Sequence, residues 1–172
     1  GGRSVALAGI MGGMNSEISS RTKNVLLESA YFDPVTIRRG AKSLGISTEA
    51  SYRFERGIDL ENVDKALKRA MALIQAIEGG RIAKGIVDNY PSPYAAPRLR
   101  LRVEKTNRYL GTSLNRAEMA DILTRLEMEV EEGGEDELLV TPPSFRVDLT
   151  REVDLTEEVA RIHGYNLIPV TT

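Results

Sequence analysis

The segment that most limits how this chain can fold is residues 91–97 (PSPYAAP), in which three of seven residues are proline. Proline fixes the backbone dihedral φ and has no N–H to donate, so a segment this rich in proline cannot continue a helix or lie inside a sheet. We expect a stiff, extended linker. The 172 residues should therefore form two small parts, residues 1–90 and 98–172, each with its own modest core.

The first part has the pattern of a mixed α and β domain. Short apolar runs predict three strands, and apolar residues at spacings of three and four predict two helices. The expected strands are 5–10, 24–30 and 81–88, and the expected helices are 34–44 and 59–77. Asp33-Pro34 suits the N-cap and first position of the first helix, and Gly45 and Gly79 end the two helices. Residues 47–57 show no clean period and are interpreted as a loop.

The second part alternates strands and helices, with clear turn signals between them. Its expected strands are 98–103, 128–132 and 137–141, and its expected helices are one ending near Gly111, one beginning after Asn115 and one over 150–163. Glu118 stands three residues after Asn115, the spacing of a capping box. Gly133-Gly134 between the last two strands predicts a hairpin. Taken together, the two parts predict an α+β fold.

Composition excludes several kinds of protein. The chain has no cysteine and a single histidine, His163, which excludes disulfides, thiolate zinc sites and multi-histidine metal sites. With 23 basic and 25 acidic residues the net charge is −2, whereas non-specific nucleic-acid binders usually carry a basic excess. No apolar run approaches the ~20 residues of a membrane span. A cytoplasmic protein without membrane contact is expected.

Two features of the first part point to a pocket. Residues 11–13 (Met-Gly-Gly) follow an apolar run, and paired glycines allow positive φ and close approach of a ligand. Glu28 follows a second apolar run, where its carboxylate needs a partner or water. The alternatives are an ordinary tight turn and a surface glutamate. Further on, Arg53 and Arg56 predict either ion pairs with acidic neighbours or a phosphate contact.

Three arginines alternate along the first strand of the second part and therefore share one face. They are Arg98, Arg100 and Arg102. Such a face is either solvated or directed at RNA or another subunit. The nearly neutral charge of the chain argues against independent DNA binding.

Four acidic residues gather around the start of the last helix. They are Asp148, Asp154, Glu157 and Glu158. Positions 154, 157 and 158 fall at i, i+3 and i+4 and so share one helix face, where converging carboxylates would suit Mg²⁺. The alternative is an acidic first turn that complements the helix dipole, neutralised by Arg151 and by Arg161, which stands four residues after Glu157.

Four segments, in this order and spacing, resemble the beta chain of bacterial phenylalanyl-tRNA synthetases. They are ALAGIMGG (6–13), NVLLESAYFDP (24–34), LGISTEASYRFERGID (44–59) and PPSFRVDLTREVDLTEEVARIHGYNLIP (142–169). The first three resemble the B3/B4 editing domain, and the last resembles the end of the B5 domain. The resemblance implies an incomplete B3/B4-type α/β domain over 1–90, the linker 91–97, and a small winged-helix-like B5 domain over 98–172.

In that family the B3/B4 domain hydrolyses tyrosine that is wrongly attached to phenylalanine tRNA. The resemblance puts Gly12 at the floor of the editing pocket, Glu28 on the tyrosine hydroxyl, and Thr48 and Ala50 in the wall. A placed polar group can discriminate a hydroxyl strongly, which agrees with this assignment. The family's pocket also uses a histidine and a Thr-Asn pair from the first half of the domain, which would precede Gly1. The chain is therefore expected to hold no complete catalytic set and to be inactive alone.

The resemblance also implies a cofactor and partners. The carboxylates of Asp148, Asp154, Glu157 and Glu158 would bind Mg²⁺ shared with the alpha subunit, so an isolated fragment would lack part of the site. The implied assembly is a heterotetramer with the alpha subunit, which charges tRNA(Phe) using ATP and in which this region contacts other beta-chain domains. The alternatives are a purely structural interaction module and a nucleic-acid-binding winged helix. An apolar face left open by missing strands would also favour a homodimer of the fragment.

Overall fold

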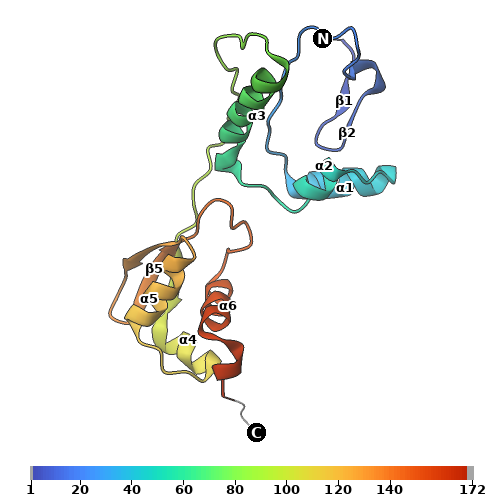
Figure 1. The fold of residues 1–172 in the computed structure, drawn as a ribbon. Helices are drawn as coiled ribbons and strands as arrows, with labels where there is room; N and C mark the ends of the chain where they lie inside the picture. The colour runs from blue at the N-terminus through green and yellow to red at the C-terminus, as the bar shows by residue number, and fades with distance from the viewer. Residues whose placement is uncertain (1, 170–172) are drawn as a thin grey trace. The chain divides into compact units, whose positions relative to one another are not determined.

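The computed structural model describes residues 2–169, and the chain forms two compact units that divide between Pro91 and Ser92 (Figure 1). Residues 91–97 contain no helix or strand. Each unit combines helices with a small antiparallel sheet, so the expected α+β class is confirmed. In the described part of the chain, no helix is long and apolar enough to cross a membrane.

The first unit holds a minimal hairpin followed by helices. Its strands are β1 (Ala6–Leu7) and β2 (Met11–Gly12), its 3₁₀ helices are η1 (Met14–Ser16) and η2 (Leu60–Asn62), and its α-helices are α1 (Pro34–Leu44), α2 (Glu49–Phe54) and α3 (Val63–Glu78). The two strands are antiparallel, with Ala6 opposite Gly12 and Leu7 opposite Met11. In Figure 1 this hairpin is dark blue and α3 is green.

Side-chain caps fix where the two shorter helices begin. The Asp33 carboxylate accepts a backbone N–H at 2.8 Å, and Gly45 ends α1 at φ +64°, as predicted. Thr48 caps α2, because its hydroxyl accepts the Ser51 N–H at 3.0 Å while the Ser51 hydroxyl accepts the Thr48 N–H at 2.9 Å. The prediction of a loop over 47–57 is wrong, since this reciprocal cap uses serine where the usual signal has glutamate or glutamine.

The three strands predicted in the first unit do not form as predicted. Residues 5–10 are not one strand, because the chain reverses between β1 and β2 with Gly9 at φ +69°. Residues 24–30 and 81–88 have no strand. A strand is held by hydrogen bonds to a neighbouring strand, and within the described residues neither segment is paired with one. The prediction from apolar runs alone therefore gave more strand than the structure contains.

The core of the first unit is small. Its buried residues are Ile10, Ile37 and Ala41, with Phe32, Ile46 and Phe54 packed against them. No residue of α3 is buried. The apolar stripe predicted along residues 59–77 therefore stays partly exposed, with Ile77 near the end of α3 at 75%.

The second unit is a three-stranded antiparallel sheet with helices. Its strands are β3 (Leu99–Arg102), β4 (Glu129–Glu132) and β5 (Glu137–Thr141), its α-helices are α4 (Val103–Leu110), α5 (Arg116–Arg125) and α6 (Glu152–His163), and η3 is a 3₁₀ helix (Tyr165–Leu167). The strand order is β3-β5-β4. In the register, Leu101 stands opposite Leu138 and Val130 opposite Val140.

Local sequence signals predicted the positions of these elements to within about two residues. The capping box before α5 forms as predicted, with the Asn115 side chain accepting the Glu118 N–H at 3.0 Å and the Glu118 carboxylate accepting the Asn115 N–H at 2.7 Å. The predicted hairpin of β4 and β5 is confirmed. The last helix begins at Glu152 rather than at Thr150, because Arg151 is still extended as its N-cap.

Alternation along the strands directs one face of the sheet into a continuous core. Eleven buried residues form this core, against three in the first unit. They include Leu101, Leu138 and Val140 from the sheet, Met119 and Leu123 from α5, and Leu155 and Val159 from α6. Helices α5 and α6 pack on each other, and each also contacts the sheet (Figure 1). Because burial of apolar surface is the main stabilising contribution, the second unit is the better stabilised of the two.

Candidate functional site

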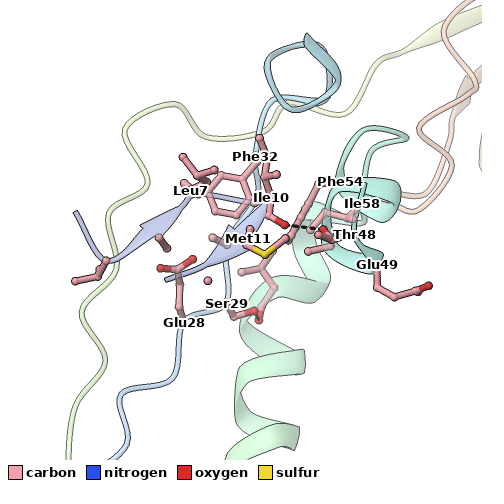
Figure 2. A pocket seen from close by; sticks show the side chains of 18 of the residues that line it. Leu7, Ile10, Met11, Glu28, Ser29, Phe32, Thr48, Glu49, Phe54 and Ile58 are labelled. Atoms are coloured by element: carbon pink, nitrogen blue, oxygen red, sulfur yellow. Dashed lines mark hydrogen bonds between the residues drawn. The ribbon is translucent and has the colours of Figure 1, made fainter. Parts of the chain in front are cut away.

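A cavity of about 1020 Å³ opens in the first unit between the hairpin, the extended segment before α1, and the starts of α2 and α3. Gly12, Glu28, Thr48 and Ala50, which were expected at an editing pocket, all line this one cavity. In the view of Figure 2, Met11 lies between Glu28 on one side and Thr48 on the other. The fold thus brings together residues from three separate stretches of the sequence.

The turn of the hairpin lines part of the cavity and packs against α1. Gly9 has φ +69°, and a Cβ at this position would lie 2.6 Å from Ile37 Cδ1, so glycine allows the turn to pack closely on α1. The next residue, Ile10, is buried, and its carbonyl accepts the Thr48 hydroxyl at 2.6 Å (Figure 2). The same hydroxyl caps α2. One side chain therefore fixes both the hairpin and the helix beside it.

The two glycines at the end of the hairpin differ in what they contribute. A Cβ at Gly13 would lie 2.5 Å from Val5 O, so the close pairing of the hairpin itself requires this glycine. A Cβ at Gly12 would meet no atom within 4 Å. Gly12 therefore presents bare backbone to open space at the cavity, where a ligand can approach the main chain.

Glu28 enters the cavity from the extended segment that precedes α1. Its side chain has no hydrogen bond or ion pair with the described residues, and the residue is exposed. The adjacent Ser29 hydroxyl donates to Val63 O at 2.8 Å, which ties this segment to the first turn of α3. The Glu28 carboxylate is thus carried by an anchored backbone while remaining free to accept a hydrogen bond from a ligand.

An aromatic pair closes the apolar side of the cavity. Phe32 and Phe54 meet edge to face, with ring centroids 4.9 Å apart and an angle of 90° between the rings, a favoured arrangement of aromatic rings. Both line the cavity, as do Ser29 and Ile58. Sequence reasoning missed these residues. A signal was present in the aromatic and apolar positions flanking each motif, but nothing in the sequence showed that the two rings meet.

The charged residues of α2 and its C-terminal end are paired with one another. Arg53 forms an i, i+4 salt bridge with Glu49 at 2.9 Å. Arg56 stacks on the Tyr52 ring, 3.6 Å from its centroid, and pairs with Glu55 at 2.8 Å. This arrangement agrees with the ion-pair alternative rather than with arginines held ready for phosphate.

The arginines of β3 and of the position just before it are likewise matched by glutamates. Arg98 pairs with Glu131, Arg100 with Glu137 at 3.2 Å, and Arg102 with Glu152. Hydrogen bonds from Arg102, then from Lys105, lower the pKa of Glu152 to about 2 despite the opposing effect of burial. The predicted shared face exists, but its positive charge is largely neutralised within the unit.

The four acidic residues near α6 do not share one partner. Arg146 donates from Nε and Nη2 to the two oxygens of Asp148 at 2.9 and 2.6 Å, and from Nη2 to Glu158 at 3.0 Å. Asp154 instead accepts two backbone N–H groups at the helix start, at 3.0 and 2.8 Å. Glu157 is exposed on α6. The shared face predicted from spacing does not gather these carboxylates at one point.

These partners also control the charge of the carboxylates. Hydrogen bonds from Arg146 lower the pKa of Asp148. Burial acts to raise the pKa of Glu158, but hydrogen bonds from Arg146 and Arg161 lower it below its ordinary value. The helical spacing had suggested that Arg161 pairs with Glu157, but in the structure it pairs with Glu158. In the described part of the chain no group of three or more acidic, histidine or cysteine side chains is placed to hold a metal ion, and Arg146 already pairs with Asp148 and Glu158.

Comparison with known proteins identifies both units. The model of the B3/4 domain matches residues 1–79, and the model of the tRNA synthetase B5 domain matches residues 99–165. The two matches fall on either side of the division at Pro91.

Proteins named phenylalanine–tRNA ligase beta subunit match nearly the whole chain. The protein of Syntrophus aciditrophicus is 56% identical, over 99% of this chain and 22% of the relative. That of Geobacter metallireducens is 53% identical, over 99% and 21%, and that of Moorella thermoacetica is 47% identical, over 98% and 21%. The chain spans about a fifth of the length of these relatives. It belongs to the family of phenylalanine–tRNA ligase beta subunits, of which it covers the B3/4 and B5 regions.

Proposed function

We propose that the first unit recognises tyrosine wrongly attached to tRNA(Phe), so that the ester can be hydrolysed within a phenylalanine–tRNA ligase. The whole ligase, with an alpha subunit as the partner of the beta subunit, would charge tRNA(Phe) with phenylalanine using ATP. Family membership supports the role in the ligase. The shape and polarity of the cavity in the B3/4 region support the editing role.

The observation that carries this proposal is an unpaired carboxylate in a cavity with an apolar side. Glu28 lines the cavity without a partner among the described residues, and Phe32 and Phe54 line it as well. An aromatic ring suits such a cavity, and a ring bearing a hydroxyl could donate to Glu28. Phenylalanine has no hydroxyl, so it would leave the carboxylate without that hydrogen bond. A site that holds a polar group for a substrate hydroxyl can discriminate strongly against the analogue lacking it.

The bare backbone at Gly12 and the helix start at Thr48 would hold the rest of the misattached amino acid. Thr48 Oγ1 is already engaged with Ile10 O and the Ser51 N–H, so its role would be to position the wall rather than to react. The described cavity lining contains no histidine or cysteine. We therefore expect this chain alone to bind a tyrosyl ester but to hydrolyse it poorly.

The experiment is hydrolysis of Tyr-tRNA(Phe) by the complete ligase, assembled with the normal beta subunit or with Glu28→Ala. A hydrogen bond to a charged group contributes about 1.5–3 kcal/mol, so discrimination between tyrosyl and phenylalanyl esters should fall by about 10- to 100-fold. Charging with phenylalanine should be unchanged, because the substitution removes only a side chain that has no partner within the described residues.

Glu49→Ala is the matched control. Glu49 also lines the cavity, but its carboxylate is bound to Arg53 and its side chain is 86% exposed. Discrimination should survive this substitution. If Glu28→Ala and Glu49→Ala behave alike, or if Glu28→Ala leaves the discrimination intact, the editing role of this cavity is wrong.

Solvent-exposed apolar side chains of the first unit support a second role for this unit, in assembly with other protein domains. Leu26 is 97% exposed, and Ile77 and Val87 are also exposed. Large exposed apolar groups of this kind usually contact another protein surface. Other beta-chain domains would be the partners in the complete ligase, and a second copy would be the partner of the chain alone. Sedimentation of the chain separates these outcomes, since a monomer at high concentration would exclude the homodimer.

A further inference from the structure

We propose that the Arg146 side chain supplies the positive charge that neutralises the carboxylates near α6. The folded second unit is then stabilised by this guanidinium rather than by a divalent metal ion. Four acidic residues in this region are the kind of ligands that Mg²⁺ takes. The structure instead directs two of them, Asp148 and Glu158, onto one arginine. A cation is therefore already present between Asp148 and Glu158.

The geometry is that of a fixed ion pair rather than of a loose surface contact. The fork of Arg146 pairs with both oxygens of Asp148, and Nη2 also reaches Glu158. The Arg146 side chain is 20% exposed and that of Glu158 is 9% exposed. A planar guanidinium matches a carboxylate with two parallel hydrogen bonds, which adds directional preference to the charge attraction.

The backbone holds Arg146 in place independently of its side chain. Its N–H donates to Pro143 O at 2.9 Å, and its carbonyl accepts the Leu149 N–H at 3.3 Å. Leu149 is 2% exposed in the core of the second unit. The loop that carries Arg146 is therefore anchored at both ends, and its side chain links that loop to Glu158 on α6.

Charge balance explains why a metal ion has little to gain here. Arg146 and Arg161 supply two positive charges to the two negative charges of Asp148 and Glu158. A divalent ion would have to displace Arg146 from both carboxylates, leaving a guanidinium with limited exposure to water and no partner. Of the two contacts, that with Glu158 is largely buried, at 9% exposure, whereas Asp148 is 60% exposed. Removing one member of the buried Arg146–Glu158 pair would be strongly unfavourable. Asp154 could not compensate, since two backbone N–H groups at the helix start hold it.

The test is thermal unfolding of the full chain and its variants, with Mg²⁺ or with a chelator. The unfolding midpoint of the unchanged chain should be the same in both conditions. Arg146→Gln should lower the midpoint, because Glu158 then keeps only Arg161. Arg146→Lys should lie between the two, since it keeps the charge and loses the fork. Arg151→Gln is the matched control, because Arg151 pairs with Asp154 but its side chain is 74% exposed.

Two results would overturn the proposal. One is stabilisation of the unchanged chain by Mg²⁺, and the other is an Arg146→Gln midpoint no lower than that of Arg151→Gln. If Arg146→Gln fails to fold, hydrogen exchange measured by NMR on the unchanged chain tests whether Mg²⁺ displaces Arg146. The Nε–H signal of Arg146 should stay protected from exchange when Mg²⁺ is added, and faster exchange on addition would show that the ion replaces the arginine.

Discussion

Replacing Thr48 with valine removes one hydroxyl while nearly preserving the shape of the side chain. That hydroxyl donates to Ile10 O at 2.6 Å and accepts the Ser51 N–H at 3.0 Å. Loss of an N-cap costs about 1 kcal/mol, and loss of the second hydrogen bond costs about 1 kcal/mol more. A total of about 2 kcal/mol corresponds to roughly a thirtyfold rise in the equilibrium constant for opening this region.

Amide hydrogen exchange can follow both elements that Thr48 connects. The Glu55 N–H bonds to Ser51 O at the C-terminal end of α2, and the Gly13 N–H bonds to Val5 O across the hairpin. Both amides should lose about thirtyfold in protection, because local opening controls their exchange. Thr48→Ser keeps the hydroxyl and should change neither. Faster exchange in α2 with unchanged exchange at Gly13 would refute the claim that Thr48 holds the hairpin.

Three further predictions concern stability, each measured by denaturant unfolding. Gly9→Ala should destabilise the first unit by more than the about 1–2 kcal/mol of a left-handed non-glycine residue, because its Cβ would also lie 2.6 Å from Ile37 Cδ1. Hydrogen bonds, chiefly from Arg102, lower the pKa of Glu152 to about 2. The contribution of the charged Glu152 to folding stability is therefore complete above its ordinary pKa of 4.5 and is lost as the pH falls through about 2. Glu152→Gln should remove this part of the loss of stability in acid. Leu123→Ala should cost about 2–5 kcal/mol, since Leu123 is fully buried, and a smaller loss would mean that the core closes around the gap.

Sequence reasoning succeeded where structure depends on near neighbours. The capping box of Asn115 and Glu118 and the hairpin of β4 and β5 lie within a few residues of their signals. It failed for the segments 24–30 and 81–88, because an apolar run shows a tendency to be extended but not the presence of a partner strand. The helix α2 was not predicted because its six residues are too few to show a helical period of apolar residues.

The two candidate sites were predictable to different degrees. Gly12, Glu28, Thr48 and Ala50 were chosen by resemblance to known motifs, and they line one cavity. Contacts such as that of Ser29 with Val63 join residues 34 positions apart, and no local pattern shows them. For the acidic group at α6, helical spacing predicted one shared face. It could not show that Arg146, in the preceding loop, pairs with both Asp148 and Glu158 while Asp154 is held at the helix start.

The unequal burial of the two units affects what a variant screen can detect. Three buried residues form the core in the first unit and eleven in the second. Selection for abundance or heat resistance responds to substitutions that open a well-filled interior, and such positions lie mainly in the second unit. Changes that only reshape the cavity around Gly12 would pass this selection unnoticed. A library intended to map ligand recognition therefore needs a readout of tRNA hydrolysis or binding, because expression levels would report on the other unit.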